Sequence, residues 1–324
     1  MPNISRSVSN YQVPFLHLNA AAEHQLPCRM SDLYRCSVTV GNPSFLSSQD
    51  IRRHGFWRVL YTSIIEKASV VFCNIEVNAQ LLRRTSMYDT YISDKKRDVS
   101  YNLGMAFAKF HSEQLLGIRN LIHLEFLKKR HAIVFVQQVG NRRPQEPDLL
   151  GQSADGSWHL FEAKGTSYKN KLAEQISYGK NQTSQVSTIH GQLPATRTVS
   201  ATYIGKDRIF THLEDPSDGG VSIIDFDEAD YNRAYYAPFL LSQQKDYPEA
   251  VEVIINGVNV HRYELPVPGG MLSIGVLSSI LPAIINGNPG DLSSALRNIA
   301  EISVKGDDQY SFGLDGFVVG FKAD

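Results

Sequence analysis

Two carboxylates and a lysine stand at a spacing that suits phosphodiester chemistry. Asp148 and Glu162 lie fourteen residues apart, and Lys164 follows Glu162 by two positions. Between the carboxylates lies Asp155-Gly156, a dipeptide typical of a hairpin turn. Such a hairpin would put both carboxylates side by side on neighbouring strands. Because strand side chains alternate with period two, Lys164 would then face the same way as Glu162.

This set of side chains matches what hydrolysis of a phosphodiester requires. A divalent cation neutralises the phosphate and lowers the pKa of the attacking water. Magnesium prefers hard oxygen ligands, commonly one or two carboxylates with waters. We therefore expect Asp148 and Glu162 to bind Mg²⁺ or Mn²⁺, with the backbone carbonyl of Ala163 as a further ligand. Lys164 is expected to orient or help deprotonate the water and to stabilise charge on the phosphorus.

Hydrophobic periodicity predicts the elements that hold these residues. Apolar residues recur at helical spacing over residues 103–130, and a β-branched run covers residues 132–139. Further strands are predicted over 148–151 and 158–163, then a helix over 171–186 and a strand over 197–205. The predicted order is helix, three strands, helix, strand.

At these residues the sequence resembles the PD-(D/E)xK nuclease superfamily. The motif reads Pro147-Asp148 and then Glu162-Ala163-Lys164, and the αβββαβ core of that superfamily is similar to the order above. The resemblance implies an α/β protein with a restriction-endonuclease-like core, a mixed sheet and N-terminal and C-terminal α+β additions. It also implies a metal-dependent endonuclease that acts on DNA, in restriction, phage defence or repair in a bacterial cytoplasm.

The same resemblance suggests further ligands for metal and nucleic acid. A carboxylate from the first helix often joins the metal in this superfamily, and Glu113 and Glu125 are the candidates, although each also fits a solvated helix face. Lys171, Gln175 and Tyr178 fall on one polar face of the helix after the third strand, together with Gln182. Gln175 with Tyr178 resembles the Gln…Tyr pair of the recombination-exonuclease branch, with a spacing one residue shorter.

Charge is distributed unevenly along the chain. From residue 214 on, 6 Lys and Arg stand against 17 Asp and Glu, a charge of −11, whereas the preceding part carries +10. A basic front part favours a polyanionic partner, although it also serves solubility. Arg142 and Arg143 precede the motif and are expected to contact phosphate.

These features predict three regions. Residues 1–100 form an N-terminal α+β region that contacts DNA or a partner, residues 101–213 form the nuclease core, and residues 214–324 form an acidic α+β region. Cutting both strands of a duplex usually takes two sites, so a homodimer is expected. The acidic region would form the dimer contact, dock a basic partner, or mimic DNA.

Other classes of protein fit the sequence less well. Three cysteines without close spacing favour reduced thiols in the cytoplasm over a zinc site or disulfides. The most apolar stretch, residues 271–285, is too short and too interrupted to span a bilayer and is predicted to be a buried helix. Nothing in the sequence matches a phosphate-binding loop or a hydrolase nucleophile elbow.

Two alternatives to a DNA nuclease stay open. The first is a nucleic-acid-binding module that uses the same fold without cutting, against which the complete Asp, Glu and Lys set argues. The second is a phosphodiesterase directed at RNA. The metal centre contacts only the phosphate, so a preference for RNA has to come from 2′-hydroxyl contacts that the motif does not contain.

Overall fold

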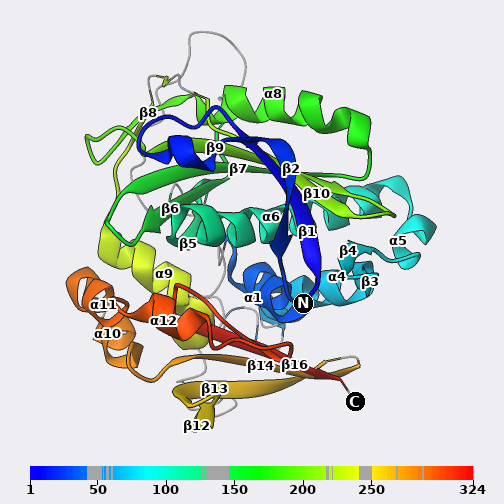
Figure 1. Cartoon of the computed structure of the whole chain (residues 1–324). Helices are drawn as coiled ribbons and strands as arrows, with labels where there is room; N and C mark the ends of the chain where they lie inside the picture. The colour runs from blue at the N-terminus through cyan, green and yellow to red at the C-terminus, as the bar shows by residue number, and fades with distance from the viewer. Residues whose placement is uncertain are drawn as a thin grey trace.

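Two β-sheets organise the chain: a large mixed sheet that curls, and a separate antiparallel sheet (Figure 1). The structure is a computed structural model. It describes residues 1–41, 53, 55, 58–59, 61–125, 127, 146–216, 219–220, 222–240, 250–267, 269–286 and 288–323. The protein is therefore an α/β protein, as the sequence predicts.

Among the described residues the large sheet has nine strands, in the order β3-β4-β1-β10-β9-β7-β6-β5 with β2 paired to β1. Their bounds are β1 Asn3–Ser9, β2 Ala20–Pro27, β3 Ile75–Asn78, β4 Leu81–Arg84, β5 Ile118–His123, β6 Leu149–Ser153, β7 Trp158–Thr166, β9 Thr196–Ile204 and β10 Ile209–Glu214. The β7–β9, β1–β10 and β1–β4 pairs are parallel, and the other pairs are antiparallel. The sheet is thus mixed.

Helices cover both faces of this sheet (Figure 1). One face is covered by α8 (Leu172–Thr183), and the long α6 (Ser93–Leu116) packs on the other. Phe161 and Ala163 of β7 point toward α6, whereas Val199 of β9 packs against Ile176 of α8. The remaining helices of this half are α1 Met30–Thr39, α4 Glu66–Asn74 and α5 Met87–Thr90, with the short turns η1 Phe15–Leu18, η2 Tyr61–Ile65 and η3 Lys169–Lys171.

The C-terminal part builds the second sheet. Its five strands run in the order β12-β13-β14-β16-β15, all antiparallel, and they are β12 Val251–Ile255, β13 Val258–Val267, β14 Gly270–Leu277, β15 Tyr310–Phe312 and β16 Phe317–Ala323. Asn256 and Gly257 join β12 to β13 with φ angles of 49° and 76°, as expected for an Asn-Gly hairpin turn. The helices here are α9 Glu228–Leu240, α10 Leu281–Asn286, α11 Pro289–Ala295 and α12 Ile299–Ser303. A separate two-stranded sheet pairs β8 Val186–Ile189 in parallel with β11 Ser222–Ile224.

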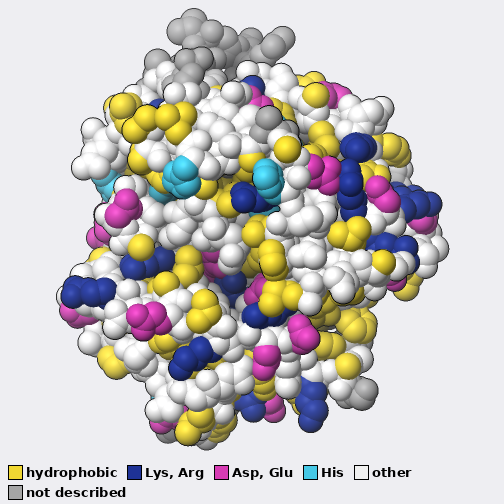
Figure 2. Space-filling model, viewed as in Figure 1, with side chains coloured by type: hydrophobic (Ala, Val, Ile, Leu, Met, Phe, Trp, Pro, Cys, Tyr) yellow, Lys and Arg dark blue, Asp and Glu magenta, His cyan; other side chains and the backbone are white. Residues whose placement is uncertain are grey.

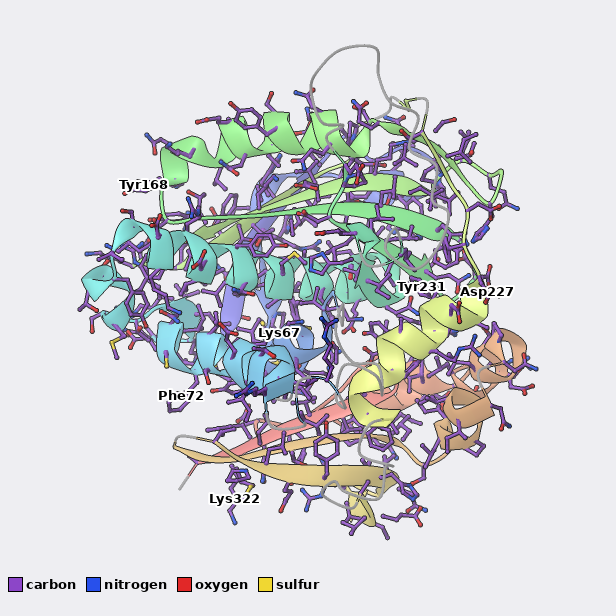
Figure 3. All side chains as sticks on the ribbon, turned by 180° about the vertical axis from the view of Figure 1, so that it is seen from behind. Lys67, Phe72, Tyr168, Asp227, Tyr231 and Lys322 are labelled. Carbon is purple, nitrogen blue, oxygen red and sulfur yellow. The ribbon has the colours of Figure 1, made fainter. Side chains whose placement is uncertain are left out.

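The large sheet crosses the boundary predicted near residue 100, because β1 to β4 belong to it. The boundary predicted between residues 213 and 214 falls at the end of β10. Beyond it, Tyr231 of α9 donates hydrogen bonds to the Asn120 side chain at 3.0 Å and to the Leu150 carbonyl at 3.1 Å. Figure 3 shows Tyr231 at the end of α9 that faces the large sheet. The acidic part is thus bonded to the edge strand β5 and to its neighbour β6.

The helix predicted over residues 103–130 is wrong beyond residue 116. Gly117 ends α6 in the left-handed conformation, with φ 61°, which glycine adopts without steric cost. The chain then turns into β5, so the first strand after the helix is Ile118–His123. The strand predicted over residues 132–139 lies outside the described residues. The observed order is α6, β5, β6, β7, α8, the short β8, and β9.

The buried helix predicted over residues 271–285 is also wrong. Its first half is β14, which lies between β13 and β16 and is buried along almost its whole length. A strand buried on both faces has a continuous apolar run rather than an alternating one, and periodicity alone does not separate it from a buried helix. In the part of the chain that the structure describes, no helix is long and apolar enough to cross a membrane.

Candidate active site

The β6–β7 hairpin brings Asp148 and Glu162 together. Leu149, the first residue of β6, pairs with Phe161, so that Asp148 lies opposite Glu162. The strands are joined by a turn in which Gly156 has φ 87°, a value that favours glycine. The sequence prediction that a hairpin places the two carboxylates side by side is confirmed.

Backbone hydrogen bonds link the two carboxylates. The Asp148 N–H donates to Glu162 Oε2 at 2.8 Å, and the Ala163 N–H donates to Asp148 Oδ2 at 3.2 Å. Since β6 begins only at Leu149, residues 162–166 of β7 extend beyond it and have no strand partner on that side among the described residues. A strand residue directs its N–H and C=O to the same edge. The Ala163 carbonyl therefore faces the side on which Asp148 lies.

Glu162 is buried, and its ionisation is suppressed. Its side chain has no exposed surface, whereas Asp148 is half-buried. Burial and the neighbouring Asp148 charge raise the pKa of Glu162 to about 8, against the opposing effect of Lys164. Without a cation, the pair therefore tends to retain a proton at neutral pH.

Lys164 lies on the same side of the strand as Glu162, as the alternation predicts. Its ammonium donates to Glu162 Oε1 and, at 2.8 Å, to Oε1 of Gln182 on α8. The Gln182 amide nitrogen donates in turn to the Glu146 carbonyl at 3.0 Å. Gln182 thus connects the lysine to the segment that leads into Pro147 and Asp148.

Two close helix approaches frame the site. A Cβ on Gly165 would lie 1.7 Å from the Ser100 carbonyl oxygen, so only glycine lets α6 reach the end of β7. On the opposite face, Gly179 of α8 lies over Val199 and the Glu162 side chain, where a Cβ would be 3.3 Å from Glu162 Cγ. Both helices are therefore held within van der Waals distance of the strand that carries Glu162 and Lys164.

A second group of side chains approaches Asp148 from the edge strand β5 and the α6 side. Burial raises the pKa of Tyr101, and the charges of Asp148, Glu162 and Glu125 raise it further. Burial and nearby Lys67 lower the pKa of His123, with Asp148 acting in the opposite direction. Tyr101 and His123 thus lie within electrostatic range of the carboxylates.

The structure places the two additional carboxylate candidates differently. Glu113 does not face Asp148: it is buried in a bidentate pair with Arg35, at 2.8 and 2.5 Å, and in an ion pair with Lys109 at 2.8 Å. The prediction that Glu113 binds the metal is therefore wrong, and its buried ion pairs give it a structural role. Glu125 is exposed and lies just after β5 rather than on the first helix, and its charge acts on Tyr101 near the site.

The candidates for nucleic-acid contact are only partly located. Arg142 and Arg143 lie outside the described residues. Lys171 is exposed at the end of η3, Tyr178 is exposed on α8 and Gln175 is half-buried. No hydrogen bond among the described residues joins these three to the site. The residue of this helix that reaches the site is Gln182, one turn beyond Tyr178. Its helical spacing from Gln175 and Tyr178 was the signal that pointed to it.

The donor set fits a hard divalent cation. Two carboxylates and the Ala163 carbonyl at one strand edge are the oxygen ligands that Mg²⁺ and Mn²⁺ accept, with waters completing the shell. A cation there would also replace the proton that the raised pKa of Glu162 retains. Within the described ranges, no group of three or more His, Cys, Asp or Glu side chains forms a metal cluster. The described residues thus form no multi-carboxylate or zinc-type cage, and they are compatible with a two-carboxylate site.

Comparison with known proteins gives no relative on which to base an assignment. No family model, no curated protein and no solved structure matches this chain.

Proposed function

We propose that the protein is a metal-dependent nuclease that hydrolyses phosphodiester bonds of DNA at Asp148, Glu162 and Lys164. The observation that carries the proposal is the convergence of these three side chains at one edge of β7. There the Lys164 ammonium and the Asp148 N–H donate to Glu162, and the Ala163 N–H donates to Asp148. A buried, mutually repelling carboxylate pair costs stability, which is a physical reason to expect a cation there.

Asp148, Glu162 and the Ala163 carbonyl would hold Mg²⁺ or Mn²⁺. Such a cation lowers the pKa of a bound water and neutralises phosphate charge. Lys164 is placed to donate to a phosphate oxygen or to orient the attacking water, because its side chain is 22% exposed at the surface of the site. Gln182 holds the lysine in place while leaving one ammonium proton for a substrate.

The order of the elements gives the proposal further support. A helix, three antiparallel strands, a helix and a strand parallel to the third is the arrangement that the PD-(D/E)xK resemblance implies for its core. We include this restriction-endonuclease-like core in the proposal, with a homodimer as the expected assembly for cutting both strands of a duplex.

Surface charge argues for local rather than broad contact with the phosphate backbone. Figure 2 shows Lys and Arg side chains interspersed with Asp and Glu at the edge where α5 and β10 lie. Arg84 pairs with Asp89 at 2.8 Å, and Lys206 pairs with the same carboxylate at 2.9 Å. These ion pairs neutralise part of the positive charge that the chain carries before residue 214. We therefore expect contacts at the site itself to supply much of the affinity for DNA.

The test incubates the purified chain with supercoiled plasmid, with single-stranded DNA and with single-stranded RNA, in Mg²⁺, Mn²⁺ or EDTA. Lys164→Ala and Glu162→Gln are compared with Lys322→Ala, which removes an exposed lysine of β16 in the second sheet, and with Lys171→Ala, which tests a candidate for nucleic-acid contact. We expect metal-dependent cutting by the wild type, Lys322→Ala and Lys171→Ala, and loss of cutting in Lys164→Ala and Glu162→Gln. Equal cutting by the wild type and Lys164→Ala would remove the basis of the proposal, and cutting of RNA alone would redirect it to the RNA alternative.

A further inference from the structure

A cleft between α4 and α6 adjoins the candidate active site. It has a volume of about 420 Å³, and its walls include Glu66 of α4 with Lys95, Arg97, Asp98, Tyr101 and Asn102 of α6. Figure 3 shows α4 and α6 running next to each other on this face, with Lys67 of α4 labelled. A cleft of this size lies in the range of small-molecule sites and is too small to enclose a duplex.

Tyr101 lines the cleft and lies within electrostatic range of the Asp148 and Glu162 carboxylates. The Ser100 carbonyl touches the backbone of Gly165, the residue after Lys164, and Tyr101 is the next residue along α6. The residue as a whole is 42% exposed, so part of its side chain is buried and part is open to the cleft. A group held against this ring would therefore lie near the same two carboxylates.

The walls of the cleft combine an aromatic ring with cationic and amide groups. Lys95 and Arg97 supply positive charge beside the acidic Glu66 and Asp98, and Asn102 supplies an amide donor and acceptor. Arg97 contacts Asp94 at 3.5 Å, but both side chains are 77% exposed, so that pair is weak and exchangeable. An aromatic ring with neighbouring cations is the surface that binds an unpaired base and its phosphate.

We propose that this cleft binds one unpaired nucleotide next to the scissile phosphate, with its base stacked on Tyr101. The inference rests on the proposed nuclease function and specifies its substrate as DNA with single-stranded character, such as an end, a flap or a loop. A base in a duplex is already stacked on its neighbours and paired, so it would have to be unstacked at a cost before it could enter the cleft.

Binding is tested separately from cutting, in the Lys164→Ala background with Mg²⁺, by fluorescence anisotropy with a labelled oligothymidylate and with a duplex. Tyr101→Ala should weaken single-strand binding roughly tenfold, within the range of one base–aromatic stack, and leave duplex binding unchanged. Tyr101→Phe keeps the ring and should bind as the parent does. Lys95→Ala should lower the slope of log affinity against log salt by about 0.7, one phosphate contact on a single strand.

Ile254→Ala is the control, since this residue is 75% exposed on β12 of the second sheet and does not line the cleft, and Tyr178→Ala tests α8 as a rival binding surface. Equal single-strand binding by Tyr101→Ala and its parent, with unchanged thermal stability, would overturn the cleft proposal even if the wild type cuts DNA. Weakened binding in Tyr178→Ala alone would move the binding surface to α8 and overturn it as well. Weakened binding in Tyr101→Ala together with a wild type that never cuts would keep the cleft and refute the catalytic proposal.

Discussion

The Lys164 ammonium lies 2.8 Å from Oε1 of Gln182, a residue eighteen positions later on α8. The same Gln182 side chain donates to the Glu146 carbonyl at 3.0 Å. The Gln182 side chain thus links Lys164 of β7 to the segment that leads into Asp148 and β6. Removing a side chain that orients an active-site group typically lowers activity about 10- to 100-fold.

Gln182→Ala is therefore expected to reduce kcat roughly 10- to 100-fold while changing KM little, because Lys164 loses the bond that orients it. Gln182→Glu should retain more activity than Gln182→Ala, since a carboxylate still accepts from the ammonium. Single-turnover cleavage kinetics separate these cases. Asn181→Ala, an exposed position on the same helix, is the control and should cut at the wild-type rate. A wild-type kcat for Gln182→Ala would remove the orienting role.

The raised pKa of Glu162 makes folding stability depend on pH. The pKa is about 8 in the folded chain, whereas the ordinary value for a glutamate is 4.5, so between these values the folded state holds a proton that the unfolded state has released. Stability should thus fall as pH rises through this window, by at most about 1.4 kcal/mol per pH unit from this group.

Urea unfolding of the wild type and Glu162→Gln at several pH values from 5 to about 8 checks this linkage. The stability difference should move in favour of the glutamine variant as pH rises, because the amide does not ionise. Mg²⁺ at the highest pH should stabilise the wild type more than the variant, since it binds the ionised pair. If the free energy of unfolding of both proteins changed with pH in parallel, the raised pKa would not belong to Glu162.

Glu113→Gln tests the structural role of the buried ion pair with Arg35. Both side chains are at most 3% exposed, so loss of one charge leaves the other unpaired in the interior. We expect a loss of about 3–5 kcal/mol of stability by chemical denaturation. The Glu76 and Arg83 pair is 41% and 35% exposed, and Glu76→Gln should cost under about 1 kcal/mol. Mg²⁺ affinity of folded Glu113→Gln should equal that of the wild type; a large decrease would restore Glu113 to the metal site.

Gly165→Ala tests the close approach of α6 to β7. The added Cβ would lie 1.7 Å from the Ser100 carbonyl oxygen, so the helix or the strand end must move. We expect a loss of at least about 1–3 kcal/mol of stability, together with a loss of cutting as Lys164 shifts. Gly290→Ala is the control, because the nearest atom to its Cβ would be 3.4 Å away. Wild-type activity and stability in Gly165→Ala would show that this contact relaxes freely.

The sequence by itself determined the site's central pair and its lysine. A glycine-containing turn between two short strands fixes the register of a hairpin, and the period of a strand fixes which side chains share a face. Asp148, Glu162 and Lys164 lie within seventeen residues of one another, so these local rules were sufficient to place them. The Asn256-Gly257 turn was predictable for the same reason.

Only the tertiary structure decided which distant residues join that pair. Glu113 has the residue type of a metal ligand, but its partner is Arg35, seventy-eight positions away, and no local pattern encodes that contact. The end of α6 at Gly117 and the double burial of β14 depend on packing against other elements, which periodicity does not contain. Tyr101 and Gln182 approach the site because helices on opposite faces of one sheet meet the same strand, and that arrangement exists only after the chain has folded.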